Sequence, residues 1–193
     1  MTLSDLDLTI DQLRQLIHAN RENDAISLIE KLEESARKHT DVMRIKSIAH
    51  SSAGGDISEA YAILRELVTR PDSSIEDLYW AGQRAAEFCD YKDAEAFLTS
   101  AIDRSKKEDN SYYLNCALLL RAYVRCHIRK LSEAKEDLEE IAEEDTEIFW
   151  SSRLGHISKE NLVHHLSGSH RLPDRPVAPC SCRKGQKSNT GKE

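Results

Sequence analysis

The fold is decided by residues 73–102, which read SSIEDLYWAGQRAAEFCDYKDAEAFLTSAI. Two stripes of apolar and small residues in this stretch recur at the three-to-four spacing of a helical face, with a short break between them. The stripes are Leu78, Ala81, Gly82 and Ala85, followed by Ala94, Leu98 and Ala101. Gly82 and Ala94 are small enough for two helix backbones to approach closely. The stretch therefore predicts a helical hairpin, whose start is marked by a capping box of Ser73 and Glu76.

The same pattern returns along the chain at a period near 34 residues. Its marker alanines are Ala25, Ala60, Ala94 and Ala134. They are 35, 34 and 40 residues apart, and each is followed by an apolar or small residue four and seven places later. A period of this length indicates stacked helical hairpins. We therefore expect an all-α fold with hairpin units at about 6–39, 41–74, 75–108 and 110–147.

The third unit resembles a tetratricopeptide repeat (TPR). That family has a small residue in the first helix, an aromatic residue before the second helix and an alanine within it, matched here by Gly82, Tyr91 and Ala94. The resemblance covers the four units and implies a right-handed α-α superhelix whose first helices line a concave groove. The fourth unit departs from the family pattern, because Arg121 and Arg125 occupy two places of its first-helix signature. An unrelated solenoid of helical hairpins would have a similar period.

Beyond the fourth unit the pattern changes. An apolar patch comes first, made of Phe149, Trp150 and Leu154. Ser158 then begins a predicted helix over 158–167, which would cap the exposed edge of the last hairpin. The repeat domain is thus expected to span 1–167. Residues 168–193 are rich in Pro, Ser, Lys and Gly, and we expect a flexible basic tail there.

Charge and composition limit the function classes. The chain of 193 residues has a formal charge of −7, but residues 171–193 carry six Lys or Arg against two acids, which leaves −11 for residues 1–170. Nucleic-acid binding by the body of the chain is therefore not expected. No apolar run approaches the roughly 18 residues of a membrane span, and the N-terminus lacks the order of a signal peptide. With five scattered cysteines, these features predict a cytoplasmic protein with reduced thiols and no membrane association.

The resemblance to the TPR family places a set of first-helix residues in the concave groove. They are Ile10, Arg14, Ile45, Ala49, Tyr79, Gln83, Leu119 and Tyr123. Tyr79 and Tyr123 are the best anchor candidates, because tyrosine joins a large contact area to a polar tip. Packing within the hairpins is an equally good interpretation of both tyrosines. The basic clamp with which the family holds a partner's terminal carboxylate is not reproduced at these places.

An acidic run over residues 133–147 contains nine acids and one base. Glu136, Glu140, Glu143 and Glu147 share a helical face. Like charges at this spacing repel one another, so a solvated outer face and a surface that attracts a basic partner are both consistent with the run.

The tail contains Cys180 and Cys182, in a stretch similar to the start of the zinc-binding motif at the C-terminus of SecA-type proteins. Zinc takes four ligands, and the second ligand pair of that motif is missing here. Upstream histidines, of which His170 is the nearest to the cysteines, would have to substitute. We therefore expect no metal and no cofactor, and we keep these three residues only as weak metal-ligand candidates.

No phosphate-binding glycine loop, dinucleotide fingerprint or catalytic constellation occurs in the sequence. The sequence therefore predicts a non-enzymatic protein-interaction module that binds a protein or peptide, with a basic partner suited to its acidic face. Within this class, a bacterial immunity protein that neutralises a basic toxin domain and a secretion chaperone are both open. A metal-dependent enzyme that uses the tail cysteines and nearby histidines is the alternative from another class. Uncovered ends of a helical stack would also permit homo-oligomers.

Overall fold

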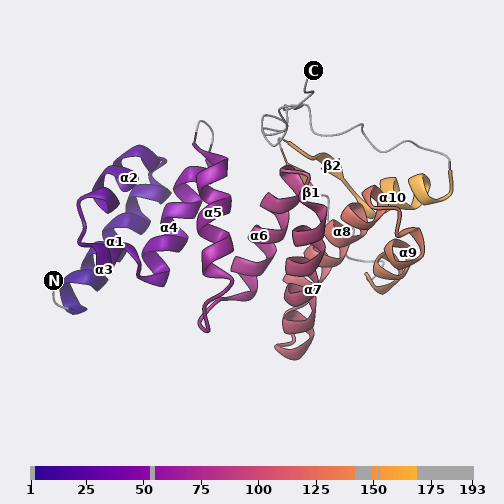
Figure 1. The fold of residues 1–193 in the computed structure, drawn as a ribbon, viewed down its shortest axis with the longest axis horizontal. Coiled ribbons are helices and arrows are strands. Elements are labelled where there is room, and N and C mark those ends of the chain that lie inside the picture. The colour runs from indigo at the N-terminus through magenta and orange to yellow at the C-terminus, as the bar shows by residue number, and fades with distance from the viewer. Residues whose placement is uncertain (1–2, 53–54, 142–148, 152, 169–193) are drawn as a thin grey trace, which may run out of the picture.

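The helices of the computed structural model lie side by side in chain order, from α1 at one end to α9 and α10 at the other (Figure 1). The structure describes residues 3–52, 55–141, 149–151 and 153–168. Its helices are α1 (Leu3–His18), α2 (Glu22–Glu30), α3 (Glu34–Arg37), α4 (Thr40–Ser51), α5 (Ile57–Leu67), α6 (Ile75–Glu87), α7 (Tyr91–Lys107), α8 (Ser111–His127), α9 (Leu131–Glu140) and α10 (Lys159–Leu166). The prediction of a mainly helical chain is confirmed.

Most helices pack on their neighbours in the chain. The pairs α1/α2, α4/α5, α6/α7 and α8/α9 are in contact, as are α5/α6 and α7/α8 between them. The pairs α1/α4 and α6/α8, which are not consecutive, also touch. Buried apolar residues form one large cluster over α6 to α10 and two smaller clusters over α1 to α6. The TPR-like geometry of the hairpins stays a prediction.

Four of the connections between helices share one backbone conformation. The residue before the N-cap of the next helix has a positive φ at Asn20, Cys89, Asp109 and Arg129. The residue that follows donates its backbone N–H to a carbonyl five residues earlier, as Lys130 does to Arg125 at 2.9 Å. This is the Schellman termination of a helix. Only glycine adopts a positive φ without steric cost, yet none of the four is glycine.

The strained backbone at Arg129 predicts a stabilising substitution. Arg129 is exposed and has φ +65°. Arg129→Gly should raise the free energy of unfolding by about 0.5–1 kcal/mol, because glycine removes the contact between Cβ and the backbone. Urea unfolding followed by circular dichroism measures the change. Arg129→Ala is the matched control and should bring no such gain; equal stabilisation by both variants would contradict the argument.

Helices α6 and α7 approach closely at Gly82, as the sequence predicted. A Cβ atom at this position would lie 2.6 Å from Cγ of Leu98 and 3.5 Å from the backbone oxygen of Ala94. Leu98 is fully buried, so it has little room to move. Glycine is therefore required by the contact between the two helices.

Gly82→Ala should lower the free energy of unfolding by about 1–2 kcal/mol, because overpacking against Leu98 outweighs the better helix propensity of alanine. The test is a double-mutant cycle in urea. In a Leu98→Ala background the added methyl group meets open space, so the same substitution at Gly82 should be neutral or stabilising. A loss of the same size in both backgrounds would refute the proposed clash.

The start of α6 lies one residue later than the sequence predicted. The capping box is made by Ser74, whose hydroxyl accepts from the backbone N–H of Asp77 (3.1 Å), while the Asp77 carboxylate accepts from the N–H of Ser74 (2.8 Å). Ser73 instead accepts a hydrogen bond from Arg104 of α7 through its backbone carbonyl. The shift has a tertiary cause, because the same Asp77 carboxylate binds Arg44 of α4 at 2.8–3.1 Å.

Two helix boundaries differ from the predicted units. The short α3 lies between the first two hairpins, where no helix was expected, and carries an ion pair of Glu34 and Lys38 (2.6 Å) at its ends. Helix α9 ends at Glu140, with Ile141 extended, rather than continuing to 147. The C-terminal turn of a helix carries partial negative charge, so further acids there oppose its extension. Residues 142–148 lie outside the described part of the chain.

A short antiparallel β-hairpin follows, which the all-α prediction missed. Strand β1 (Phe149–Ser151) pairs with β2 (Gly155–Ile157), and Trp150 lies opposite His156. Aromatic and β-branched residues favour such strands. Helix α10 then confirms the predicted C-terminal helix: Ser158 caps it by accepting from the N–H of Asn161 (3.2 Å), and it contacts α8 and α9.

The tail predicted at 168–193 lies, from residue 169 onward, outside the described residues. None of the described helices has the length and apolar character that crossing a bilayer requires.

Candidate functional site

Most of the predicted groove residues lie in the interior. Ile10, Ile45, Ala49, Tyr79, Gln83, Leu119 and Tyr123 are all no more than 5% exposed. The prediction that these side chains line an open groove is therefore wrong. The physical reason is that the first helices pack against one another in two pairs, α1 with α4 and α6 with α8, so the face predicted to be free is covered. The Tyr79 ring, for example, lies 5.6 Å from that of Tyr113 on α8, and burial raises the pKa of Tyr123 to about 12.

Arg14 is the exception, because its side chain is 52% exposed. It pairs with Asp11 on its own helix (3.1 Å) and lies 3.7 Å from Asp41 on α4. Asp41 pairs in turn with Arg44 (3.0 Å), which binds Asp77 of α6. Alternating charges thus connect α1, α4 and α6.

The predicted acidic face is only partly present on the surface. Glu136 is exposed, and Glu140 forms an ion pair with Lys106 of α7 at 2.7 Å. Glu143 and Glu147 lie outside the described residues. Asp137, in the same acidic run, points into the protein with a side chain only 3% exposed.

Asp137 is the centre of a buried ionic network across α7, α8 and α9. Its carboxylate accepts from Arg121 (2.6 and 3.2 Å) and from Arg125 (2.7 Å). Arg125 also donates to Glu95 of α7 (3.1 Å), which pairs with Lys130 (2.7 Å). The sequence showed both arginines as departures from the family pattern but did not reveal their partners, because those partners come from other helices.

Glu95 makes part of this network dependent on pH. Burial opposes ionisation of Glu95, but its hydrogen bonds with Lys130 and Arg125 together outweigh burial and hold its pKa below the ordinary value. A carboxyl group whose pKa is lower in the folded than in the unfolded state stabilises the folded state at neutral pH. This contribution is lost as the pH falls through the folded-state pKa.

Asp137→Asn should lower the free energy of unfolding by about 3 kcal/mol, because it leaves the buried guanidinium of Arg121 and the partly buried one of Arg125 without their shared carboxylate. The neighbouring Glu136→Gln makes the same chemical change on an exposed residue and should stay within about 0.5 kcal/mol of the parent. Urea unfolding of the parent and of the two variants measures these free energies. Similar stabilities for the two variants would show that the network contributes little.

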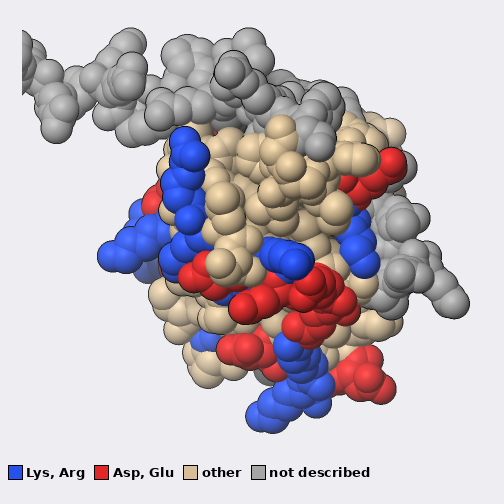
Figure 2. Space-filling model, turned by 90° about the vertical axis from the view of Figure 1, so that its right-hand side faces the viewer, with Lys and Arg blue, Asp and Glu red and all other residues tan. Residues whose placement is uncertain are grey.

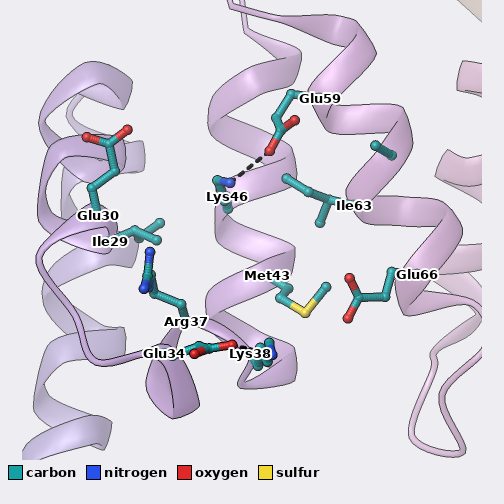
Figure 3. Close-up of a pocket in the computed structure, with 11 residues that line it drawn as sticks. Ile29, Glu30, Glu34, Arg37, Lys38, Met43, Lys46, Glu59, Ile63 and Glu66 are labelled. Carbon is teal, nitrogen blue, oxygen red and sulfur yellow. Dashed lines mark hydrogen bonds and ion pairs between the residues drawn. The ribbon is translucent and has the colours of Figure 1, made fainter.

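An open cleft of about 410 Å³ is lined by α2, α3, α4 and α5, with Met43 and Lys46 of α4 in its middle (Figure 3). Its floor is apolar, since it is formed by Ile29, Met43 and Ile63, each of which is at most 8% exposed. Its remaining lining is Glu30, Glu34, Arg37, Lys38, Lys46, Glu59, Ala62 and Glu66. The unpredicted helix α3 forms part of one wall, so the sequence reasoning missed this cleft.

The rim of this cleft carries charges of both signs. Lys46 pairs with Glu59 at 2.9 Å, and Lys38 pairs with Glu34 at 2.6 Å (Figure 3). Within the described residues, no ion pair holds Glu30 or Arg37. An apolar floor with charged groups at its edge suits a peptide segment with an apolar side chain and polar neighbours.

A second cleft of about 700 Å³ lies between α9 and α10, at the far end of the chain of helices. Leu138, Ile141, Val163 and Leu166 contribute its apolar lining. Figure 2 views this end and shows uncharged surface beside a group of Asp, Glu, Lys and Arg side chains. Only two helices and the residues next to them build this cleft, whereas four helices build the first.

Groups with catalytic or metal-binding chemistry are sparse in the described residues. Cys180, Cys182 and His170 lie outside them. Inside them, no group of three or more His, Cys, Asp or Glu side chains is arranged to hold a metal ion. Burial raises the pKa of the Cys126 thiol to about 11, which disfavours the reactive thiolate.

Comparison with protein-family models, with curated proteins and with solved structures finds no match to this chain. The resemblance to the TPR family therefore depends on the residues named above.

Proposed function

We propose that this chain is a non-catalytic protein-interaction module whose helices form four TPR-like hairpins closed by α10. The proposal is supported by the pairing of consecutive helices and by the shared left-handed turn that ends four of them. Close approach at Gly82 beside Ala94 agrees with the signature of the family. Contacts of α10 with both helices of the last hairpin, α8 and α9, are consistent with a capping helix.

The cleft between α2, α3, α4 and α5 is the observation that carries the binding function. Its floor offers Met43 and Ile63 to an apolar side chain, and its rim offers groups of both charges to polar neighbours. The volume of about 410 Å³ lies within the range of ligand-binding pockets. We infer that a short segment of a partner protein inserts one or two apolar side chains there.

An inhibitor of a basic toxin is the second candidate function, with the acidic run of α9 as its contact surface. The described part of that run has a smaller free surface than the sequence predicts, because Asp137 is buried and Glu140 pairs with Lys106. The cleft is therefore the better candidate site.

Two alanines permit a matched test of the cleft. Ala62 and Ala96 each stand two residues after a marker alanine, and both are exposed on a second helix of a hairpin. Only Ala62 lines the cleft. Ala62→Arg should block it, whereas Ala96→Arg adds the same side chain elsewhere.

The experiment selects binders to the full-length chain from a displayed library of random peptides and measures the affinity of each for both variants. We expect Ala62→Arg to weaken the selected peptides about tenfold or more, because an arginine side chain fills the space that the ligand needs, and Ala96→Arg to leave them unchanged. Thermal unfolding checks that both variants are folded. A library without binders, or binders that ignore Ala62→Arg, would overturn the proposal.

A further inference from the structure

Four aromatic side chains gather where the N-terminal half of α6 packs on the first turn of α8. The ring of Tyr79 lies 5.3 Å from that of Trp80 and 5.6 Å from that of Tyr113, and Tyr113 lies 5.1 Å from Tyr112 in an edge-to-face arrangement. Tyr79 is buried beneath the others, Trp80 and Tyr113 are half-buried, and Tyr112 is 59% exposed. Tyr112 therefore keeps solvent-exposed ring surface that a ligand can contact.

A carboxylate stands at the edge of this aromatic cluster. Glu76 is exposed and accepts a hydrogen bond from the indole N–H of Trp80 at 3.3 Å. Burial, followed by the charge of Glu76 and a hydrogen bond with it, raises the pKa of Tyr113. The indole N–H holds the carboxylate beside the Trp80 ring. An exposed negative charge next to aromatic faces is the combination that attracts an organic cation.

The chain uses this chemistry internally one turn further along α6. The guanidinium of Arg84 lies over the Trp80 ring at 5.9 Å from its centroid, and its Nη1 atom pairs with Glu87 at 2.6 Å. One arginine therefore contacts a ring and a carboxylate at the same time. A planar guanidinium is suited to both contacts, whereas the ammonium of lysine offers only a point charge.

We propose that Glu76, Trp80, Tyr112 and Tyr113 form an arginine-binding patch, which takes the guanidinium of an arginine side chain presented by a partner peptide. The guanidinium stacks on the exposed tyrosine and donates to the Glu76 carboxylate. Residues 1–170 carry a formal charge of −11, so the surrounding field favours a positively charged partner. This patch lies on α6 and α8 and shares no residue with the lining of the cleft between α2 and α5.

The test uses two labelled peptides that differ only in one side chain, a single arginine flanked by glycine and serine and the same peptide with citrulline. Citrulline keeps the shape and planarity of the group but has no charge. Titration of the full chain, followed by NMR, gives the two dissociation constants. We expect the citrulline peptide to bind about tenfold more weakly, because it loses the ion pair and the cation–π contact.

Variants of the patch locate the binding. Glu76→Gln keeps the acceptor for Trp80 but removes the charge, and it should weaken the arginine peptide about three- to fivefold. Tyr112→Ala should weaken it by a similar factor, and Tyr112→Phe should restore it, because the ring alone provides the stacking surface. Glu136→Gln removes one exposed charge elsewhere and is the matched control. Glu76 and Tyr112 are both exposed, so their variants are expected to fold.

Three outcomes would overturn the proposal. Equal binding of the arginine and citrulline peptides would show that no cation is recognised. Equal losses in Glu76→Gln and Glu136→Gln would assign the binding to the overall charge rather than to the patch. Binding that appears only after Arg171, Arg175 and Arg183 are replaced by glutamine would assign the patch to the chain's own tail. Ala62→Arg should leave the arginine peptide bound, which keeps this result separate from that of the cleft.

Discussion

The carboxylate of Asp77 joins the second helical hairpin to the third, and much of the arrangement around it follows from its burial. Its side chain is 4% exposed and accepts hydrogen bonds from Arg44 of α4 and from the backbone N–H of Ser74. A carboxylate at this depth is tolerated only when it is paired and hydrogen-bonded. Arg44 also binds Asp41 and the backbone carbonyl of Asp72. One group thus fixes the first turn of α6 and the position of α4 against it.

A second buried aspartate does the same for the last hairpin. Asp137 of α9 accepts from Arg121 and Arg125 of α8, and Arg125 reaches Glu95 of α7. In both places a first helix supplies the arginine and another helix supplies the carboxylate. Removing either partner of such a pair leaves an uncompensated buried charge, so each pair opposes a change of register between its helices.

This tight packing decides which surfaces are left for binding. First helices that touch one another cover the side chains that would otherwise line a groove, including Tyr79 and Tyr123. Two groups of side chains on the described surface are left for contact with a partner, those of the cleft and those around Glu76. The additional helix α3 forms part of one wall of the cleft. Where α6 packs on α8, the ring of Tyr79 contacts those of Trp80 and Tyr113, and Glu76 accepts a hydrogen bond from Trp80.

The sequence by itself determined the helices, the close approach at Gly82 and the C-terminal helix begun by Ser158, because helical periodicity, residue size and capping act within a few residues. Only the tertiary structure decided that Tyr123 lies inside, that Asp137 belongs to the interior rather than to the acidic surface, and that α9 ends at Glu140. Periodicity shows which residues share a face. It does not show what covers that face, because this depends on the angles and contacts between helices that are distant in the chain.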